Sequence, residues 1–505
     1  MYWVIAFALF ALVVGGYGPS SSAQSGPQVV VGQGGDPPSM DPHKSRGSFG
    51  GNILFNLFDG LTRFDSEGRL HPALATSWRS VNDRTWQFSL RRGVRFHNGV
   101  EFTADTVVFN FKRLFEPDVH RLNTEFRNIE RIDVLDRFTI NIVTKGPDPV
   151  MPQRVTELLI SEPGHTQQVG EERMNREAMG TGPYRLVEWR PNQHVVLQAF
   201  DNYLGGKSKV DRLVFRTIPE ESTRIAELLT GRVDIISDVP PEQIRATNAN
   251  PRLRIESRPS KRVPFVGINL LDWGPRPLKD VRVRQALNHA VNVPEILRTI
   301  YLGMGRQTAT IFRGDYFGYD TSIEPYPHDP AKARQLLAEA GFPNGFQVNL
   351  LTSEQIILKG VELAQAIAGQ LARVGVRAEV KPVAHATYRN MVIGGQEQQK
   401  NEGLYVWNWG TSLSDPDSPL SGFLHSKGIT SYYRNPELDT LIDRGRVTLN
   451  PEDRRRIYRE VQLLLKREAP VIFLFQAPDI WGVSQRIVWK ARQDQNVLGK
   501  DMDLR

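Results

Sequence analysis

The sequence predicts a mixed α/β (α+β) protein built from two or three lobes. Its 505 residues exceed what one ordinary domain packs around a single core, so each lobe should bury a core of its own. Short runs that alternate polar and apolar residues are interleaved with helical patterns that have clear capping residues. No internal repeat of fixed period is visible, which argues against solenoids and propellers.

Strand patterns are clearest in the first half of the chain. Residues 85–90 alternate polar and apolar side chains, as a half-buried strand does. Thr103 is a favoured N-cap residue type, and we expect a helix from there until Pro117 stops it. Residues 138–143 and 213–218 are also typical of strands.

Helix boundaries are sharper in the second half. The Asp-Pro pair at 329–330 supplies an N-cap and a proline at the first helical position. Residues 361–374 carry apolar side chains at helical spacing. The Asn-Pro pair at 450–451 opens another helix, which Pro470 ends, and the apolar residues 471–475 then predict a buried strand.

The N-terminus has the layout of a cleavable signal peptide. An apolar run over residues 2–14 is too short to span a bilayer and is followed by small residues up to Ala23. We therefore expect residues 1–23 to be a signal peptide, although no Lys or Arg precedes the apolar run. The mature protein is expected in the periplasm, and not as a lipoprotein, because the chain has no cysteine to carry a lipid.

Composition narrows the remaining functions. The lack of cysteine excludes disulfides, thiolate metal sites and a cysteine nucleophile. The formal charge is +7, but 63 basic residues are interleaved with 56 acidic ones, so nucleic acid is not an expected partner. Neither His-Glu-x-x-His nor Gly-x-Ser-x-Gly occurs, which removes two common hydrolase signatures. We expect no metal and no cofactor.

An aromatic segment near residue 410 is the best candidate for a binding site. Tyr405, Trp407 and Trp409 would share one face if the segment is a strand. Gly410 follows directly and would let a ligand approach the backbone closely. Aromatic walls with accessible backbone amides suit a binding pocket, whereas a core-filling stripe is the alternative interpretation.

Two carboxylates follow a few residues later. Asp415 and Asp417 flank a proline, a context in which aspartates commonly cap a turn. As an acid and a base, the same two residues would instead serve an extracytoplasmic hydrolase. We keep that enzyme as the alternative to a binding protein, although no motif supplies an activated nucleophile.

A series of motifs, found in one order along the chain, resembles a known family. They are Leu-Ala-Thr-Ser-Trp at 74–78, Leu-Arg-Arg-Gly-Val-Arg-Phe-His-Asn-Gly at 90–99, Gly-Thr-Gly-Pro-Tyr at 180–184, Asn-Tyr-Leu-Gly-Gly at 202–206, Gly-Arg-Val-Asp at 231–234, Asp-Val-Arg-Val-Arg-Gln-Ala-Leu at 280–287 and Asn-Pro-Glu-Leu-Asp at 435–439. In these motifs the chain resembles bacterial solute-binding protein family 5, the peptide-type substrate-binding proteins of ABC importers.

The resemblance implies a type II periplasmic binding protein, with two lobes joined by a two-segment hinge and an inserted small domain. The expected parts are lobe one at 24–50, 170–268 and 478–505, the small domain at 51–169, lobe two at 269–477, and hinge segments around 265–271 and 473–481. The lobes would close over a peptide or peptide-like polar solute, and the permease subunits of an ABC importer would read the closed form. Such a protein is not an enzyme and is expected to be a monomer.

The resemblance also implies ligand-binding residues. In peptide-binding relatives an aspartate after a Trp-Gly segment pairs with the ligand's α-amino group, and the matching position here is Ser412, which offers no countercharge. Either Asp36, in a segment that lines the cleft of relatives, compensates, or the ligand has no free amine there. The expected ligand-binding residues are Asp36, Pro38, Met40, Tyr405, Trp407, Trp409, Gly410, Thr411, Ser412, Asp415 and Phe475.

Overall fold

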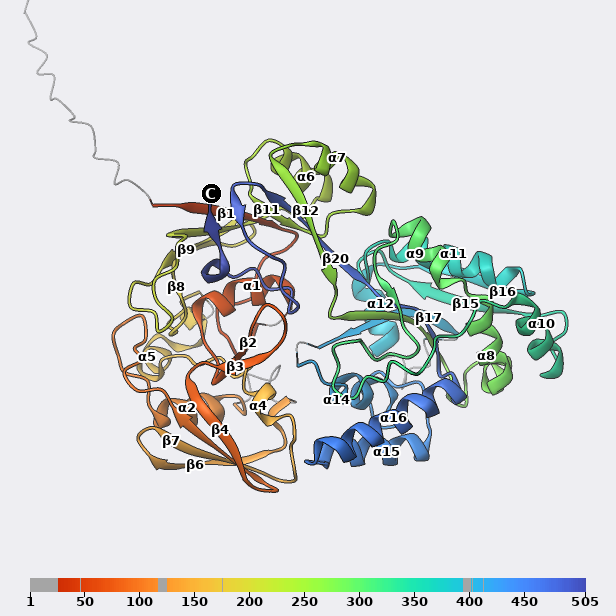
Figure 1. The fold of residues 1–505 in the computed structure, drawn as a ribbon, viewed down its shortest axis with the longest axis horizontal. Coiled ribbons are helices and arrows are strands. Elements are labelled where there is room, and N and C mark those ends of the chain that lie inside the picture. Colours follow the sequence, from red (N-terminus) through yellow and green to blue (C-terminus); the bar gives the residue numbers. More distant parts are fainter. Residues whose placement is uncertain are drawn as a thin grey trace, which may run out of the picture.

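The computed structural model describes residues 26–45, 47–116, 125–174, 176–393, 401, 403–411 and 413–505. The predicted signal peptide, residues 1–23, lies outside the described residues. Figure 1 shows two bodies side by side, one formed mainly by the first half of the chain and one mainly by the second half. We call the body around the seven-stranded sheet lobe one and the body around the five-stranded sheet lobe two.

Lobe one is built on a seven-stranded sheet that is covered on both faces. Its strands, in spatial order, are β12 (Leu253–Pro259), β20 (Pro478–Ser484), β11 (Ile235–Ser237), β1 (Gln28–Gln33), β10 (Arg212–Thr217), β9 (His194–Ala199) and β8 (Tyr184–Arg190). Only β1 pairs in parallel, with β10 and β11. Alternate side chains of β1 enter two separate cores, which pack against helix α1 (Ser48–Leu57) and helix α6 (Glu221–Leu229) respectively.

A four-stranded antiparallel sheet lies beside lobe one and has its own core. Its order is β4 (Ala75–Asn82), β5 (Thr85–Leu90), β7 (Thr139–Thr144) and β6 (Ile129–Asp136), with helix α2 (Ala104–Arg113) packed against it. The predicted strand at 85–90 and the predicted Thr103 cap are confirmed, because Thr103 and Thr106 form a reciprocal capping box. The helix ends at Arg113, before Pro117.

Lobe two surrounds a five-stranded sheet and the largest core. The sheet order is β16 (Val376–Pro382), β15 (Phe346–Thr352), β17 (Leu404–Gly410), β13 (Arg262–Ile268) and β18 (Val471–Phe473). The longer helices are α8 (Val281–Ala290), α9 (Val293–Ile300), α10 (Pro330–Glu339), α11 (Gly360–Ala372), α12 (His385–Ile393), α15 (Pro436–Val447) and α16 (Pro451–Glu468). The predicted caps are confirmed, since the side chains of Asp329 and Asn450 accept hydrogen bonds from the first turns of α10 and α16.

The remaining elements complete the fold. They are β2 (Thr62–Phe64), β3 (Leu70–Pro72), α4 (Met151–Arg154), α5 (Pro163–Met174), α7 (Ile244–Ala249), β14 (Arg306–Gln307), α14 (Asp417–Pro419), a π-helix (Leu420–Leu424), β19 (Phe475–Gln476), β21 (Ile487–Val488), β22 (Asp503–Leu504) and 3₁₀ turns at Pro241–Gln243, Arg276–Lys279 and Gly499–Asp501. Within the described residues, none of the helices combines the length and apolar character of a membrane span.

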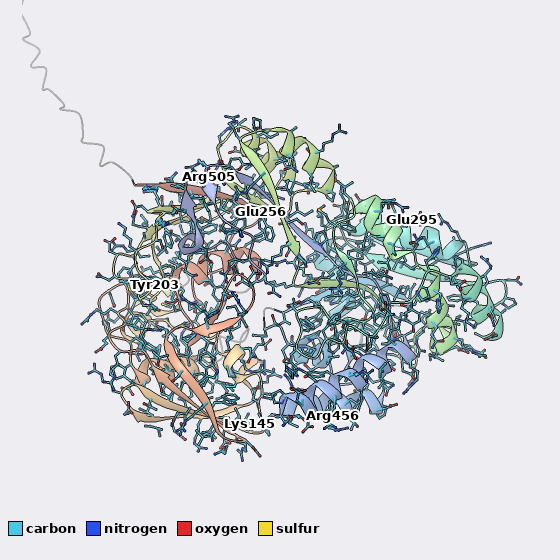
Figure 2. All side chains as sticks on the ribbon, in the orientation of Figure 1. Lys145, Tyr203, Glu256, Glu295, Arg456 and Arg505 are labelled. Atoms are coloured by element: carbon cyan, nitrogen blue, oxygen red, sulfur yellow. The ribbon has the colours of Figure 1, made fainter. Side chains whose placement is uncertain are left out.

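Two short crossings join the lobes. Strand β12 leads through Ser260 and Lys261 into β13, while β19 leads through Ala477 into β20. The crossings are hydrogen-bonded to each other, because the Ser260 amide donates to the Ala477 carbonyl at 2.8 Å and the Gln476 side chain donates to the Ser260 carbonyl at 2.8 Å. In Figure 2, Glu256 on β12 and Glu295 on α9 mark the two sides of this region.

The crossing differs from the expected hinge on one side. We expected the first hinge segment around 265–271 and lobe one to continue to residue 268, but β13 is hydrogen-bonded on both edges within the lobe-two sheet. Its apolar residues from Val263 onward are buried there, so the chain changes lobes at residues 260–261. Similarly, Ile53 and Leu57 of α1 pack in the lobe-one core, although the expected small domain began at residue 51. The other expected boundaries stay predictions.

Candidate functional site

A cavity of about 460 Å³ lies between the two lobes. Lobe one contributes α1 and the segment after α4, and lobe two contributes α12 and the end of β17. Lys261 of the first crossing, Arg262 at the start of β13 and Asn496 near the C-terminus complete the wall. The volume lies in the range of about 300–1,000 Å³ typical of small-ligand sites, so the cavity has room for a solute of a few residues.

Strand β17 supplies an aromatic wall. Trp407 pairs with Phe265 of β13 and stacks on Tyr388 of α12, with ring centroids 6.0 Å apart. Trp409, further along the same strand, is half-buried and donates from its indole nitrogen to the Ser418 hydroxyl at 3.3 Å. Both tryptophans line the cavity. The Trp407 indole N–H is buried and has no hydrogen-bond partner among the described residues.

Gly410 is required by a close approach of the backbone. A Cβ atom at Gly410 would lie 2.8 Å from the backbone oxygen of Lys261, closer than side-chain carbons come to other atoms. We expected the missing side chain of this glycine to leave space for a ligand. In the structure, the backbone of Lys261 in the first crossing occupies that space. The glycine thereby allows β17 to pack directly against the first crossing, beside Lys261 and Arg262, which both line the cavity.

The charged residues of the cavity wall are divided between the lobes. Lys261, Arg262 and Arg389 lie at the crossing and on α12, whereas Glu125 and Glu157 come from the side of lobe one. The described wall therefore has one more cation than anion. Burial lowers the pKa of Lys261, and Arg262 lowers it further, while carboxylates that include Glu157 oppose this effect. A ligand carboxylate near Lys261 would favour the charged ammonium.

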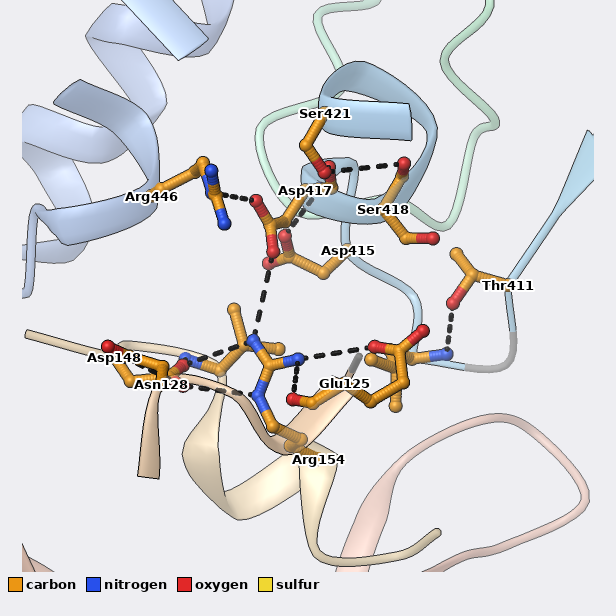
Figure 3. Close-up of polar contacts among 12 residues, drawn as sticks. Glu125, Asn128, Asp148, Arg154, Thr411, Asp415, Asp417, Ser418, Ser421 and Arg446 are labelled. Carbon is orange, nitrogen blue, oxygen red and sulfur yellow. Dashed lines mark hydrogen bonds and ion pairs between the residues drawn. The ribbon is translucent and has the colours of Figure 1, made fainter. Parts of the chain in front are cut away.

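A second cationic centre lies at the edge of the cavity, where the lobes meet. Figure 3 shows Arg154 of α4 surrounded by carboxylates, with Asp148 at 3.1 Å, Glu125 at 3.2 Å and Asp417 at 3.7 Å. Asp417 belongs to α14 of lobe two and is also bound by Arg446 at 2.9 Å. Burial raises the pKa of Asp417, and both arginines oppose that rise. The Arg154–Asp417 pair thus joins the two lobes.

Asp415 lies two residues earlier in the chain but is bound entirely within lobe two. Arg454 of α16 forms a bidentate pair with it, at 2.6 and 2.9 Å, and both side chains are buried. Although burial alone would lower the pKa of Arg454, the adjacent carboxylate raises it. Asp415 is not part of the described cavity wall, so its geometry is that of a structural ion pair.

Of the predicted ligand-binding residues, the structure brings four to the cavity wall: Trp407, Trp409, Gly410 and Thr411. Ser412 lies outside the described residues. Tyr405 and Phe475 are buried in the lobe-two core, because the aromatic stripe of β17 begins in the core and reaches the cavity only at its end. Contact between any of these residues and a ligand stays a prediction.

The predicted residues from the N-terminal segment lie away from the cavity wall. Asp36 accepts hydrogen bonds from the Trp189 indole at 3.0 Å, the Asn192 amide at 3.0 Å and the Thr217 hydroxyl at 3.1 Å, all within lobe one. Met40 is fully buried in the lobe-one core, and Pro38 is exposed. Asp36 therefore fastens the turn between β8 and β9, which leaves it badly placed to replace the countercharge missing at residue 412.

Sequence reasoning missed the charged residues of the wall. Lys261 and Arg262 could have been found from the sequence, because they are two adjacent cations at the start of an apolar strand. Arg389 sits on an exposed helix face like many surface arginines, and Glu157 has no local motif. No group of three or more His, Cys, Asp or Glu side chains that could hold a metal ion occurs in the part of the chain that the structure describes.

Comparison with known proteins shows which family this chain belongs to. The family model for the bacterial extracellular solute-binding proteins, family 5, matches residues 69–431. The chain is 28% identical over 487 residues to the glutathione-binding protein GsiB of Pectobacterium atrosepticum, covering 94% of this chain and 92% of the relative.

Solved structures of low identity share the fold. The periplasmic binding protein DppA of Helicobacter pylori, in complex with the peptide STSA, superposes with a TM-score of 0.80 at 23% identity, covering 95% of this chain and 98% of that one. The ABC transporter substrate-binding protein CtaP of Listeria monocytogenes superposes with a TM-score of 0.85 at 21% identity, covering 95% of this chain and 100% of that one. The fold is that of the type II periplasmic binding proteins, as expected.

Proposed function

Since the chain belongs to the bacterial extracellular solute-binding proteins of family 5, and is the substrate-binding component of an ABC importer, we propose that its cleft captures a small anionic peptide. Glutathione is the first candidate, because it is the ligand in the name of the relative that matches over almost the whole chain. The observation that carries the proposal is the charge of the cavity wall, with cations at the crossing and on α12 facing carboxylates on the lobe-one side.

Glutathione matches this distribution of charge. At neutral pH it carries two carboxylates and one ammonium, so the ligand has one more anionic group than cationic groups. The described cavity wall has the opposite excess, with Lys261, Arg262 and Arg389 against Glu125 and Glu157. Charge complementarity of this kind favours the right partner and penalises ligands of the wrong sign.

Capture requires no chemical change in the ligand. The alternative that we kept open, a hydrolase that uses Asp415 and Asp417, needs one of these carboxylates to reach a substrate. Asp415 is occupied by Arg454 and Asp417 by Arg446 and Arg154, so both carboxylates are held in ion pairs. Closure of the lobes, driven by ligand contacts with both, is sufficient for the proposed function.

The same proposal extends to location and partners. We propose that the protein is exported, acts in the periplasm as a monomer, and presents its closed form to the permease subunits of its importer. The family's description as extracellular supports export in general. Neither a nucleic acid nor a cofactor has a role in this scheme.

Calorimetry and mass spectrometry on the purified protein test the proposal. Titration with glutathione, oxidised glutathione and a neutral dipeptide should give saturable binding, tightest for an anionic peptide, with a Kd on the order of micromolar or below. Mass spectrometry should recover the ligand unchanged after prolonged incubation. Absence of saturable binding by every peptide would overturn the proposal, and a cleaved product would favour the hydrolase.

A further inference from the structure

Glu157 has a distinctive environment among the charged residues of the cavity wall. It follows α4, is partly buried, and lines the cavity from the lobe-one side. Its backbone amide donates to the Arg154 carbonyl at 3.1 Å, but no described residue forms a hydrogen bond or an ion pair with its carboxylate. The carboxylate acts on Lys261 through longer-range attraction across the cavity. It is therefore an anion that faces the ligand space without a direct partner among the described residues.

The other carboxylate of the wall has a different status. Glu125 pairs with Arg154 at 3.2 Å, and Arg154 also binds the Glu125 backbone carbonyl at 2.9 Å. These bonds tie Glu125 to the junction of the lobes that Figure 3 shows. Of the two acids, Glu157 is the one whose charge a ligand cation can meet directly.

A small side pocket of about 50 Å³ opens beside Glu157 and shares Phe55, Glu157 and Asn496 with the main cavity. The three cations that line this side pocket interact with residues other than Glu157. Arg492 is bound by Asp494 and Asp501, each at 2.6 Å, and Lys500 is bound by Asp501 at 2.6 Å. The third, Arg63, hydrogen-bonds to Tyr203 and is attracted to the buried Asp59. None of the three neutralises Glu157 by direct contact.

We infer that Glu157 receives the ammonium group of the ligand, in place of a carboxylate at residue 412. The inference rests on the proposed capture of a small anionic peptide and adds the orientation of that peptide in the cleft. The ammonium lies on the lobe-one side, and the carboxylates lie toward the cations of the crossing and α12. Glu157 and Lys261 line the same cavity, so an amino acid head group would direct its ammonium toward Glu157 and its carboxylate toward Lys261.

This orientation has a specific chemical consequence. A γ-glutamyl group presents its ammonium and one carboxylate on the same carbon atom, so one group satisfies Glu157 and Lys261 together. An ordinary α-linked peptide separates its terminal ammonium from its terminal carboxylate by the length of the chain. The Glu157 subsite therefore favours γ-glutamyl peptides over α-linked peptides of the same composition.

Calorimetry with two proteins and two ligands tests the inference. The proteins are the wild type and Glu157→Gln; the ligands are glutathione and its deaminated analogue, glutaryl-cysteinyl-glycine. Glu157→Gln should weaken glutathione binding by roughly 10- to 100-fold, the usual range for losing a hydrogen bond to a charged group. It should leave binding of the deaminated analogue unchanged or slightly stronger. Glu157→Asp, which keeps the charge, should recover part of the preference for the amine.

Glu125→Gln is the matched control, because it removes the other carboxylate of the same wall and should change the affinity of both ligands by the same factor. Unchanged thermal unfolding of ligand-free Glu157→Gln checks that the fold is intact. An equal loss for both ligands in Glu157→Gln would overturn the inference and leave the proposed function standing. If wild type binds neither ligand nor any other anionic peptide, the proposed function fails and the inference fails with it.

Discussion

Asp415 and Asp417 lie two residues apart, are both largely buried and both pair with arginine. They differ in whether the arginine belongs to the same lobe or to the facing one. The partner of Asp415 is Arg454, which belongs to the same lobe and is as buried as the aspartate. Asp417 shares Arg446 of its own lobe with Arg154 of the facing one. The first pair is present whenever lobe two is folded, whereas the Arg154–Asp417 pair exists only while the lobes are together. Neighbouring carboxylates can therefore report separately on folding and on closure.

The largest expected effect comes from breaking the pair within lobe two. Asp415→Ala leaves the Arg454 guanidinium buried without its bidentate partner, which should lower the free energy of unfolding by about 3–5 kcal/mol. Chemical denaturation of the ligand-free protein measures this loss. A loss below about 1 kcal/mol would show that the pair contributes little to the stability of lobe two.

The buried carboxylate of Asp59 should make the stability of the protein depend on pH. In lobe one, burial raises the pKa of Asp59 from 3.8 to about 6, although Thr181 and Tyr203, which is labelled in Figure 2, donate hydrogen bonds to it. Its contribution to stability is fully present below about pH 4 and is lost as the pH rises through 6, a change of about 3 kcal/mol. Asp59→Asn should remove this slope in denaturation curves recorded from pH 4 to pH 7.5; an unaltered slope would assign it to other groups.

Ligand contact can be separated from closure at Trp409, which lines the cavity but is held within lobe two. Trp409→Ala should weaken peptide binding by about 10-fold, through loss of the aromatic wall, without opening the ligand-free protein. Calorimetry measures the affinity and small-angle X-ray scattering the separation of the lobes. If the variant binds as tightly as wild type, Trp409 is only a packing residue.

The smallest effect is expected at the pair between the lobes. Asp417→Asn should change the free energy of unfolding by less than about 1 kcal/mol, because Arg154 keeps Asp148 and Glu125 as partners. It should nevertheless weaken peptide binding by about fivefold and increase the scattering radius of the ligand-free protein, since closure loses an ion pair. Identical affinity and radius in the variant would remove Asp417 from the closure mechanism.

Elements set by local chemistry were the predictable part of this molecule. Asn450 caps α16 and residues 85–90 form β5 because both depend on neighbouring residues alone. The two tryptophans at the end of β17 were predicted to line the site because they lie close together in the sequence. In contrast, Asp36 was assigned to the ligand although it fastens a turn of lobe one, and Glu157 was missed although it lines the cavity. Both errors concern residues whose role is set by contacts between segments far apart in the chain.

The brevity of the crossings bears on affinity. One crossing is a single residue, Ala477, and the other is residues 260–261, each hydrogen-bonded to its counterpart. Such a link keeps the second lobe within reach of any peptide that the first has bound, so the second set of contacts forms in an intramolecular step. The effective concentration of that lobe is then on the order of millimolar or higher, and modest attractions from two surfaces combine into tight retention.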